Sequence, residues 1–141
     1  EKLMPVALEA LLEALPLYID DILGPKAQNN AASTYCKLLT REDGKIDWNQ
    51  PASSIYNRYR ALTPWPGIWT AWNEKRIKLL EVKPADKKIP AGKVQVEGDQ
   101  IFIGTAENSV QITELQIEGK TSMNAKTFLS GHKGFDGSVL Q

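Results

Sequence analysis

Residues 63–67 form a loop that contains two prolines, and this loop limits what the chain can fold into more than any other segment. Pro64 and Pro66 each fix their own φ angle and bias the preceding residue toward extended backbone, so a helix cannot continue through the loop. Gly67 then permits a turn. The chain before the loop therefore shows helical periodicity, and the chain after it shows the period of two that is typical of strands.

The segment before this loop has the pattern of an amphipathic helix. Its apolar residues recur at i, i+3, i+7 and i+10 and would lie on one helix face: Ala52, Ile55, Tyr59 and Leu62. The helix is expected to begin near Pro51, because the missing N–H of a proline would have no partner in a first turn anyway. Asn49 or Gln50 is the expected cap.

Five short segments after the loop have the composition and spacing of strands. They are residues 68–72, 76–82, 93–96, 101–104 and 110–117, and most are separated by turn residues. Leu80 and Val82 shift the alternation of the second segment, as a β-bulge would. The sequence predicts a mainly β fold with flanking helices, in which an OB-like five-stranded antiparallel barrel follows a helix and a linker.

Both ends of the chain carry helical signals. The first helix has apolar residues at helical spacing, and Pro16 is expected to kink or end it; these apolar residues are Met4, Leu8, Leu11, Leu12 and Leu15. Asn124 is a good N-cap for a last helix that ends at Gly131. The glycine-containing tail, residues 132–141, is expected to be flexible.

Composition excludes several classes of protein. Hydrophobic residues make up 42% and charged residues 24% of 141 residues, which indicates a globular chain. No run approaches the roughly 20 apolar residues of a membrane-spanning helix, and the start does not resemble a secretory signal. Cys36 is the only cysteine, so a reducing, cytoplasmic location is expected. Because the first residue is Glu1, we expect the chain to be part of a longer protein.

The formal net charge is zero, but the charges are segregated along the chain. Residues 1–24 carry a net −4, residues 37–93 a net +6 and residues 94–141 a net −3. A basic centre between acidic flanks is a weak indication of an anionic partner. The alternative interpretation is an ordinary solvated surface.

We expect no catalytic or metal site in this chain. His132 lies in the expected flexible tail, where a preorganised base would be poorly held and an exposed histidine is the simpler interpretation. Cys36 has no histidine nearby and is interpreted as a small, partly buried residue. One Cys and one His do not supply the usual ligands of a zinc site.

Aromatic and cationic side chains are the remaining candidates for binding. The four tryptophans could stack on nucleotides, but we expect most of them in the core; they are Trp48, Trp65, Trp69 and Trp72. Arg76 and Lys78 share one face of a strand by alternation, with Lys75 at the turn beside them. Such a ridge could follow a phosphate backbone, or it could be an edge strand protected by lysine.

Two sets of residues make this chain resemble methionyl-tRNA formyltransferase. The first set comprises Tyr35, Lys37, Leu38, residues 42–48, Pro51, Ala52 and residues 60–67. The second comprises Leu115, Gln116, residues 118–120, Met123, Ala125, Phe128 and Leu129. The resemblance covers nearly the whole chain, in family order, and concerns the C-terminal part of the enzyme.

The resemblance implies a division of the chain. Residues 1–24 would be the terminal helix of a Rossmann-like catalytic domain that is otherwise missing. Residues 25–45 would be the interdomain linker, residues 46–131 the OB-like C-terminal domain, and residues 132–141 a flexible tail. The family's catalytic residues belong to the missing domain, so the resemblance transfers none of them to this chain.

The resemblance also implies a role in translation initiation. The whole enzyme formylates the methionine amine of initiator Met-tRNA with 10-formyltetrahydrofolate as co-substrate, and this chain alone is expected to be inactive and to hold no cofactor. In the family, linker and barrel help to hold the tRNA acceptor arm. That favours seven side chains as phosphate contacts: Lys37, Lys45, Arg58, Arg60, Lys75, Arg76 and Lys78.

Two alternatives stay open. The chain could be the C-terminal domain of a formyltransferase that acts on a nucleotide sugar, or a stand-alone OB-like module that binds oligonucleotides. In every case, burial of the leucines of the first helix against another protein surface is energetically favoured. We therefore expect that helix to dock on the barrel, to exchange between chains or to form a dimer.

Overall fold

The structure is a computed structural model that describes residues 3–141 in two compact units. The first unit ends at Lys37 and the second is Leu38–Gln141. The second unit thus starts eight residues before the domain boundary expected at residue 46. Residues 40–45, expected as linker, form a turn that is hydrogen-bonded to Trp69 in the sheet.

The first unit contains one helix, α1 (Leu3–Ile19), and a short 3₁₀ turn, Asn30–Ala32. None of the helix residues is buried. The helix includes Pro16 rather than ending there, and the N–H of Asp20 still bonds the Pro16 carbonyl at 3.0 Å. Proline removes one donor but leaves its own carbonyl available, so the last turn can form beyond it. Cys36, expected to be partly buried, is exposed.

Helix α2 (Ala52–Leu62) confirms the predicted amphipathic stripe. Ala52, Ile55 and Leu62 are buried, and Tyr59 packs against the core. Pro51 occupies the N-cap position without a side-chain hydrogen bond, so neither Asn49 nor Gln50 caps the helix. The N–H of Thr63 closes the last turn on the Tyr59 carbonyl at 3.1 Å, and both peptide bonds that precede the loop prolines are cis.

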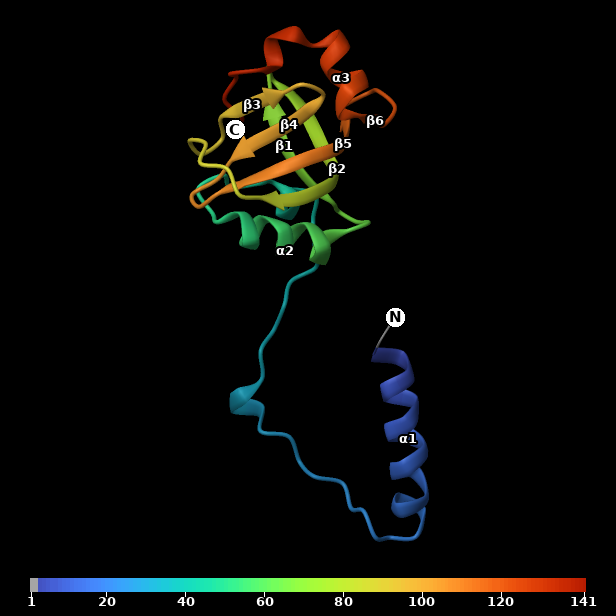
Figure 1. The fold of residues 1–141 in the computed structure, drawn as a ribbon. Helices are drawn as coiled ribbons and strands as arrows, with labels where there is room; N and C mark the ends of the chain where they lie inside the picture. The colour runs from blue at the N-terminus through green and yellow to red at the C-terminus, as the bar shows by residue number, and fades with distance from the viewer. Residues whose placement is uncertain (1–2) are drawn as a thin grey trace. The chain divides into compact units, whose positions relative to one another are not determined.

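Six antiparallel strands form one sheet in the second unit (Figure 1). They are β1 (Ile68–Trp72), β2 (Lys75–Ala85), β3 (Val94–Glu97), β4 (Gln100–Gly104), β5 (Ser109–Ile117) and β6 (Met123–Asn124). The strand order is β1-β2-β5-β4-β3, and β6 pairs with β5. The mainly β class with flanking helices is confirmed, with one short strand more than predicted. The OB-like assignment stays a prediction that this order does not contradict.

The pairing of β2 with β5 contains the predicted irregularity. The register shifts between Leu79 and Glu81 and again before Val82. On the regular part of β2, Ile77 and Leu79 are buried, while Arg76 and Lys78 lie on the other face and are half-buried. The bulge therefore restores an inward position for Val82 after the alternation has been broken.

The last residues of the chain join the two edges of the sheet. Ala71 of β1 and Gln141 exchange two main-chain hydrogen bonds, of 2.9 and 3.2 Å. On the opposite edge, the N–H of Val94 in β3 bonds the Ser138 carbonyl at 2.9 Å, and that of Leu140 bonds the Gly92 carbonyl at 2.9 Å. The prediction of a flexible tail is therefore wrong, because these residues satisfy the free main-chain groups of both edge strands.

An aromatic cluster packs beneath helix α3 (Ala125–Gly131), which Asn124 caps through a 2.8 Å bond from the Thr127 N–H. Figure 1 shows α2 and α3 at opposite ends of the sheet. Phe128 is fully buried and meets Trp72 and Phe135 edge to face. His132, expected as an exposed tail residue, is half-buried and stacks on Phe128 with ring centroids 4.5 Å apart. The tail is thus part of the core.

Substitution of two neighbouring residues tests whether the tail is packed. Leu140 is 4% exposed and Val139 65% exposed. We expect Leu140→Ala to lower the free energy of unfolding by about 2–5 kcal/mol, as buried leucines do, and Val139→Ala to change it little. Urea denaturation followed by tryptophan fluorescence measures both, because all four tryptophans lie in the second unit. Equal, small effects would show that the tail is loose.

Candidate nucleic-acid interface

Trp69 lies at the centre of the outer face of β1. Its indole N–H donates to the Arg41 carbonyl at 2.8 Å, and its own carbonyl accepts from the Ile46 N–H at 2.9 Å. Lys45 pairs with Trp69 in a parallel bridge. These bonds hold residues 41–46 beside β1, although they are more than twenty residues away in sequence.

Four cationic side chains surround the Trp69 ring. The Arg76 guanidinium lies 4.0 Å and the Lys45 ammonium 5.9 Å from the ring centroid. Lys78 is directly opposite Trp69 in the β1–β2 register, and Arg41 lines a shallow hollow with Trp69, Arg76 and Lys78. We call these four residues, Arg41, Lys45, Arg76 and Lys78, the cationic surface.

The positive charge of this surface is only partly neutralised. Arg76 pairs with Glu42 at 3.1 Å, and the partners are 34% and 70% exposed. Within residues 3–141 the structure gives no ion pair for Arg41, Lys45 or Lys78. Because an exposed ion pair contributes little, Arg76 can exchange Glu42 for another anion at small cost. The surface therefore keeps net positive charge that is available to a ligand.

Close packing of glycines brings the turn before β1 against the proline loop. A Cβ on Gly44 would lie 2.2 Å from the Gly67 carbonyl oxygen and 3.1 Å from the Trp69 ring. Gly67 has a φ of 75°, and a Cβ there would lie 2.4 Å from Cε of Lys78. Lys78 thus lies along the loop backbone. A side chain at residue 44 would clash with the Gly67 carbonyl, while at residue 67 it is the positive φ that favours glycine.

The remaining sequence-predicted cations lie elsewhere. Arg58 on α2 donates to the Asp43 carbonyl at the edge of the cationic surface. Arg60 bonds the Asn57 side chain at 2.6 Å and lies over the Tyr56 ring, within α2 itself. Lys75 is exposed at the β1–β2 turn, where alternation puts it on the other side of the strand from Arg76. Lys37 is exposed in the first unit.

Sequence reasoning therefore found three members of the cationic surface and missed one. Lys45, Arg76 and Lys78 were candidates, and Arg41 was not. Arg41 is brought to the site by its main-chain carbonyl, which receives the Trp69 N–H, and no local pattern shows such a bond. The tryptophans divide as follows: Trp48 is buried, Trp69 and Trp72 are half-buried, and Trp65 is exposed.

One carboxylate close to Lys45 in sequence is held in its ionised form. Asp47 accepts hydrogen bonds from the Asn49 main chain at 3.0 Å and from the side chains of Asn49 and Gln50. These bonds, the Asn49 N–H first, lower the pKa of Asp47 below its usual value, against a small opposing effect of desolvation. Its hydrogen bonds stay within its own turn, and within residues 3–141 the structure gives no ion pair between it and Lys45.

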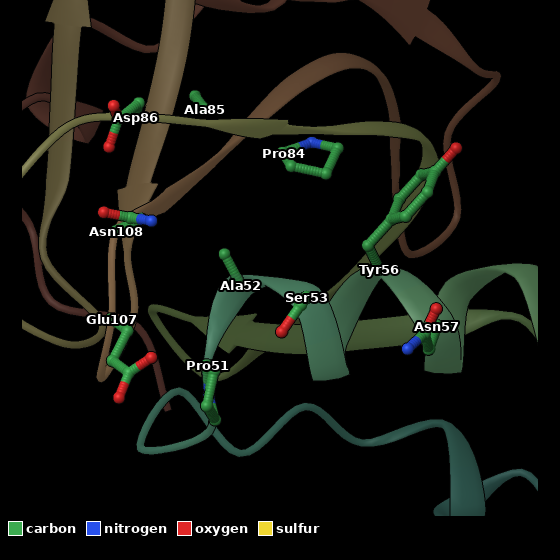
Figure 2. A pocket seen from close by; sticks show the side chains of 10 residues that line it. All are labelled: Pro51, Ala52, Ser53, Tyr56, Asn57, Pro84, Ala85, Asp86, Glu107 and Asn108. Atoms are coloured by element: carbon green, nitrogen blue, oxygen red, sulfur yellow. The ribbon is translucent and has the colours of Figure 1, made fainter.

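A second hollow, of about 370 Å³, lies between α2 and the end of β2 (Figure 2). Its walls include Tyr56 and Asn57 on α2, Asp86 after β2, and Glu107 and Asn108 in the β4–β5 turn. Figure 2 shows the Tyr56 ring beside Pro84 and the Glu107 carboxylate at the other end. Because its lining contains two carboxylates and no Lys or Arg, this hollow does not suit a phosphate.

The described residues contain neither a membrane-spanning helix nor a cluster of metal ligands. Among residues 3–141, no helix combines the length and the apolar character needed to cross a membrane. In the same range, no group of three or more His, Cys, Asp and Glu side chains is placed to hold a metal ion.

Comparison with known proteins decides the family. The family model described as formyl transferase, C-terminal domain, matches residues 38–133, which is most of the second unit. The chain belongs to this family. The resemblance seen in the sequence is thereby confirmed, and the cationic surface lies on a formyltransferase C-terminal domain.

Curated relatives carry a more specific name. The chain is 40% identical to methionyl-tRNA formyltransferase from Dehalococcoides mccartyi over 92% of its own length and 42% of the relative's. It is 33% identical to the enzyme of that name from Caldanaerobacter subterraneus, over 100% of the chain and 46% of the relative. The chain therefore spans less than half the length of these relatives.

Solved structures support the fold. HypX from Aquifex aeolicus matches with a TM-score of 0.61 at 20% identity, over 94% of this chain and 24% of HypX. A structure of HypX in complex with tetrahydrofolic acid matches with a TM-score of 0.61 at 21% identity, over 94% of this chain and 24% of HypX. At this identity the likeness concerns the fold of the formyltransferase C-terminal domain and not its ligands.

Proposed function

We propose that this chain is the tRNA-binding C-terminal portion of a methionyl-tRNA formyltransferase, and that its cationic surface contacts the phosphates of initiator Met-tRNA. The observation that carries the proposal is the gathering of Arg41, Lys45, Arg76 and Lys78 around Trp69. Three of these cations lack an ion-pair partner in the part of the chain that the structure describes. The name of the curated relatives favours tRNA over a nucleotide sugar.

Phosphate contact by this surface would hold RNA without reading its sequence. Lysine and arginine bind backbone phosphates through charge, and release of counterions from the RNA supplies most of the affinity. Arg76 suits this role, because stacking on Trp69 orients the guanidinium while the side chain stays 34% exposed. Arg58 stands at the edge of the surface and adds positive charge there. Lys37, Arg60 and Lys75 are weaker candidates.

We assign the chemistry of formyl transfer to the part of the parent enzyme outside this chain. In this proposal 10-formyltetrahydrofolate binds the Rossmann-like N-terminal domain, and residues 1–24 end that domain. The relatives are more than twice as long as the stretch that this chain matches, which leaves room for such a domain. Formyl transfer to Met-tRNA by the isolated chain would contradict this assignment.

The salt dependence of tRNA binding tests the role of the cationic surface. For four phosphate contacts, the slope of log K against log salt concentration should be about −2.8 to −3.6, at roughly −0.7 to −0.9 per phosphate. Lys45→Gln and Lys78→Gln should each weaken binding and reduce the magnitude of the slope by about 1. Fluorescence anisotropy of labelled initiator tRNA at several salt concentrations measures both quantities.

Lys126→Gln is the matched control for these variants. Lys126 is an exposed lysine on α3 that pairs with Asp99 at 3.0 Å, and it is not among the residues that line the hollow beside Trp69. It should leave the salt slope unchanged. If all three variants have the same slope as the natural chain, or if the chain does not bind tRNA, the proposed function is wrong.

We also propose that the apolar residues of α1 are covered by another surface, which in the parent enzyme is the N-terminal domain. Leu8, Leu11 and Leu12 are each more than half exposed in the structure. Burying a leucine side chain contributes about 1.5–3 kcal/mol, so a row of them strongly favours a packed partner. In the isolated chain, a second copy or the barrel would supply that partner.

Light scattering combined with hydrogen exchange tests whether another surface packs against α1. We expect the α1 amides of the 141-residue chain to be protected, and Leu11→Glu to abolish both that protection and any dimer. Glu13→Gln, on the same helix, should change neither. A strict monomer whose α1 amides exchange freely would refute the proposal.

A further inference from the structure

Trp65 is the one tryptophan of the chain whose ring the described structure leaves without a recorded partner. Its side chain is 57% exposed, while Trp48 is 5% exposed and donates to Thr70. Trp69 donates to Arg41 and is covered by Arg76, and Trp72 packs on Phe128. A large apolar ring that is left in water, with its N–H unbonded, is typical of a binding surface.

The loop that carries Trp65 is anchored on both sides. The N–H of Gly67 bonds the Leu62 carbonyl at 2.8 Å, and the Thr63 hydroxyl bonds the Tyr59 carbonyl at 2.7 Å. Pro66 is buried, and the prolines on either side of Trp65 restrict the backbone φ angles. The ring is therefore presented by a backbone that loses little freedom when a ligand binds.

Trp65 borders the cationic surface. A hollow of about 270 Å³ is lined by Trp65, Pro66, Trp69, Arg41, Arg76 and Lys78. The lining thus combines two aromatic rings with three cationic residues. This pairing of a ring with cations matches a nucleotide, which has a flat base and a negative phosphate.

We propose that Trp65 stacks against one unpaired base of the bound RNA while Arg41 and Lys78 contact the adjoining phosphate. This inference rests on the proposed function and narrows it, because it assigns a single-stranded nucleotide to this part of the surface. A base inside a duplex has both faces covered by its neighbours and cannot stack on a side chain. Trp65 therefore contacts a terminal, looped-out or otherwise unpaired nucleotide.

The charges beside Trp65 favour RNA over an apolar protein surface as its partner. Arg41 and Lys78, with no ion-pair partner in the described range, would have to lose water against an apolar surface. Burial of an unpaired charge is costly, whereas a phosphate compensates it. The same hollow thus binds an apolar partner poorly and a nucleotide well.

Binding of short RNAs by two variants of the 141-residue chain tests the inference. The probes are a labelled ten-nucleotide single-stranded oligoadenylate and an RNA duplex of the same length. Trp65→Leu keeps an apolar side chain without an aromatic face, and Trp65→Tyr keeps a ring. We expect Trp65→Leu to weaken single-strand binding by about 5- to 150-fold, the range found when one stacked base loses its aromatic partner. We expect duplex binding to stay within about twofold of the natural chain's, because only phosphate contacts remain there.

The Tyr variant and the quenching of fluorescence complete the test. Trp65→Tyr should keep most of the single-strand affinity, and the single strand should quench tryptophan fluorescence in the natural chain but much less in both variants. Equal single-strand affinity of the Leu variant and the natural chain would overturn the inference and, with the tRNA salt slope unchanged, leave the proposed function standing. An equal loss for single strand and duplex would also overturn it, since it would mean a disturbed cationic surface. If the natural chain binds neither probe nor tRNA, both proposals fail together.

Discussion

Strand β1 has hydrogen-bonded partners along both of its edges, and the rest of the second unit depends on this. One edge pairs with β2, while the other receives the Ile46 N–H and exchanges two bonds with Gln141. On the inner face of the sheet, the fully buried Thr70 hydroxyl accepts from the Trp48 indole at 3.1 Å and donates to the Gln141 carbonyl at 3.0 Å. Ile46, Trp48, Thr70 and Gln141 thus tie the start of the domain, the sheet and the end of the chain together.

The outer face of the same strand carries Trp69, the centre of the cationic surface. The segment from residue 41 to residue 46 is held against β1. Arg41 and Lys45 therefore lie close to the two cations that alternation places on one face of β2, Arg76 and Lys78. Trp69 fills the space between them and orients Arg76. The surface is therefore built from backbone hydrogen bonds and one aromatic ring, and the proposed binding of a polyanion would need no rearrangement of the fold. The acidic hollow between α2 and β2 is the contrasting region of the same domain.

Local patterns were sufficient for most of the fold. The stripe on α2 and the Asn124 cap depend on residues a few positions apart, and the bulge in β2 on a shift in alternation; all three are present. The sequence did not show how the chain ends would pack. Residues 132–141 look loose because of Gly134 and Gly137, yet Phe135 and Leu140 are buried and the main chain bridges two strands. Those hydrogen bonds join residues far apart in sequence and depend little on side-chain type.

In the candidate site, too, local patterns identified some residues, while others depend on contacts between distant parts of the sequence. Arg76 and Lys78 were found by alternation along one strand, whereas Arg41 depends on a bond to Trp69 that spans 28 positions. Arg60 was also a candidate phosphate contact, and its side chain interacts with its own helix. Most of the four tryptophans were expected in the core, without any distinction among them, and only the folded loop shows that the ring of Trp65 is exposed.

Chemical acetylation of lysines in the presence and absence of initiator tRNA, read by mass spectrometry, tests the central claim most directly. If the cationic surface is where RNA phosphates bind, tRNA will slow the acetylation of Lys45 and Lys78 and leave Lys83 and Lys126 unaffected. Uniform protection of all four lysines, or protection of Lys83 and Lys126 alone, would contradict it.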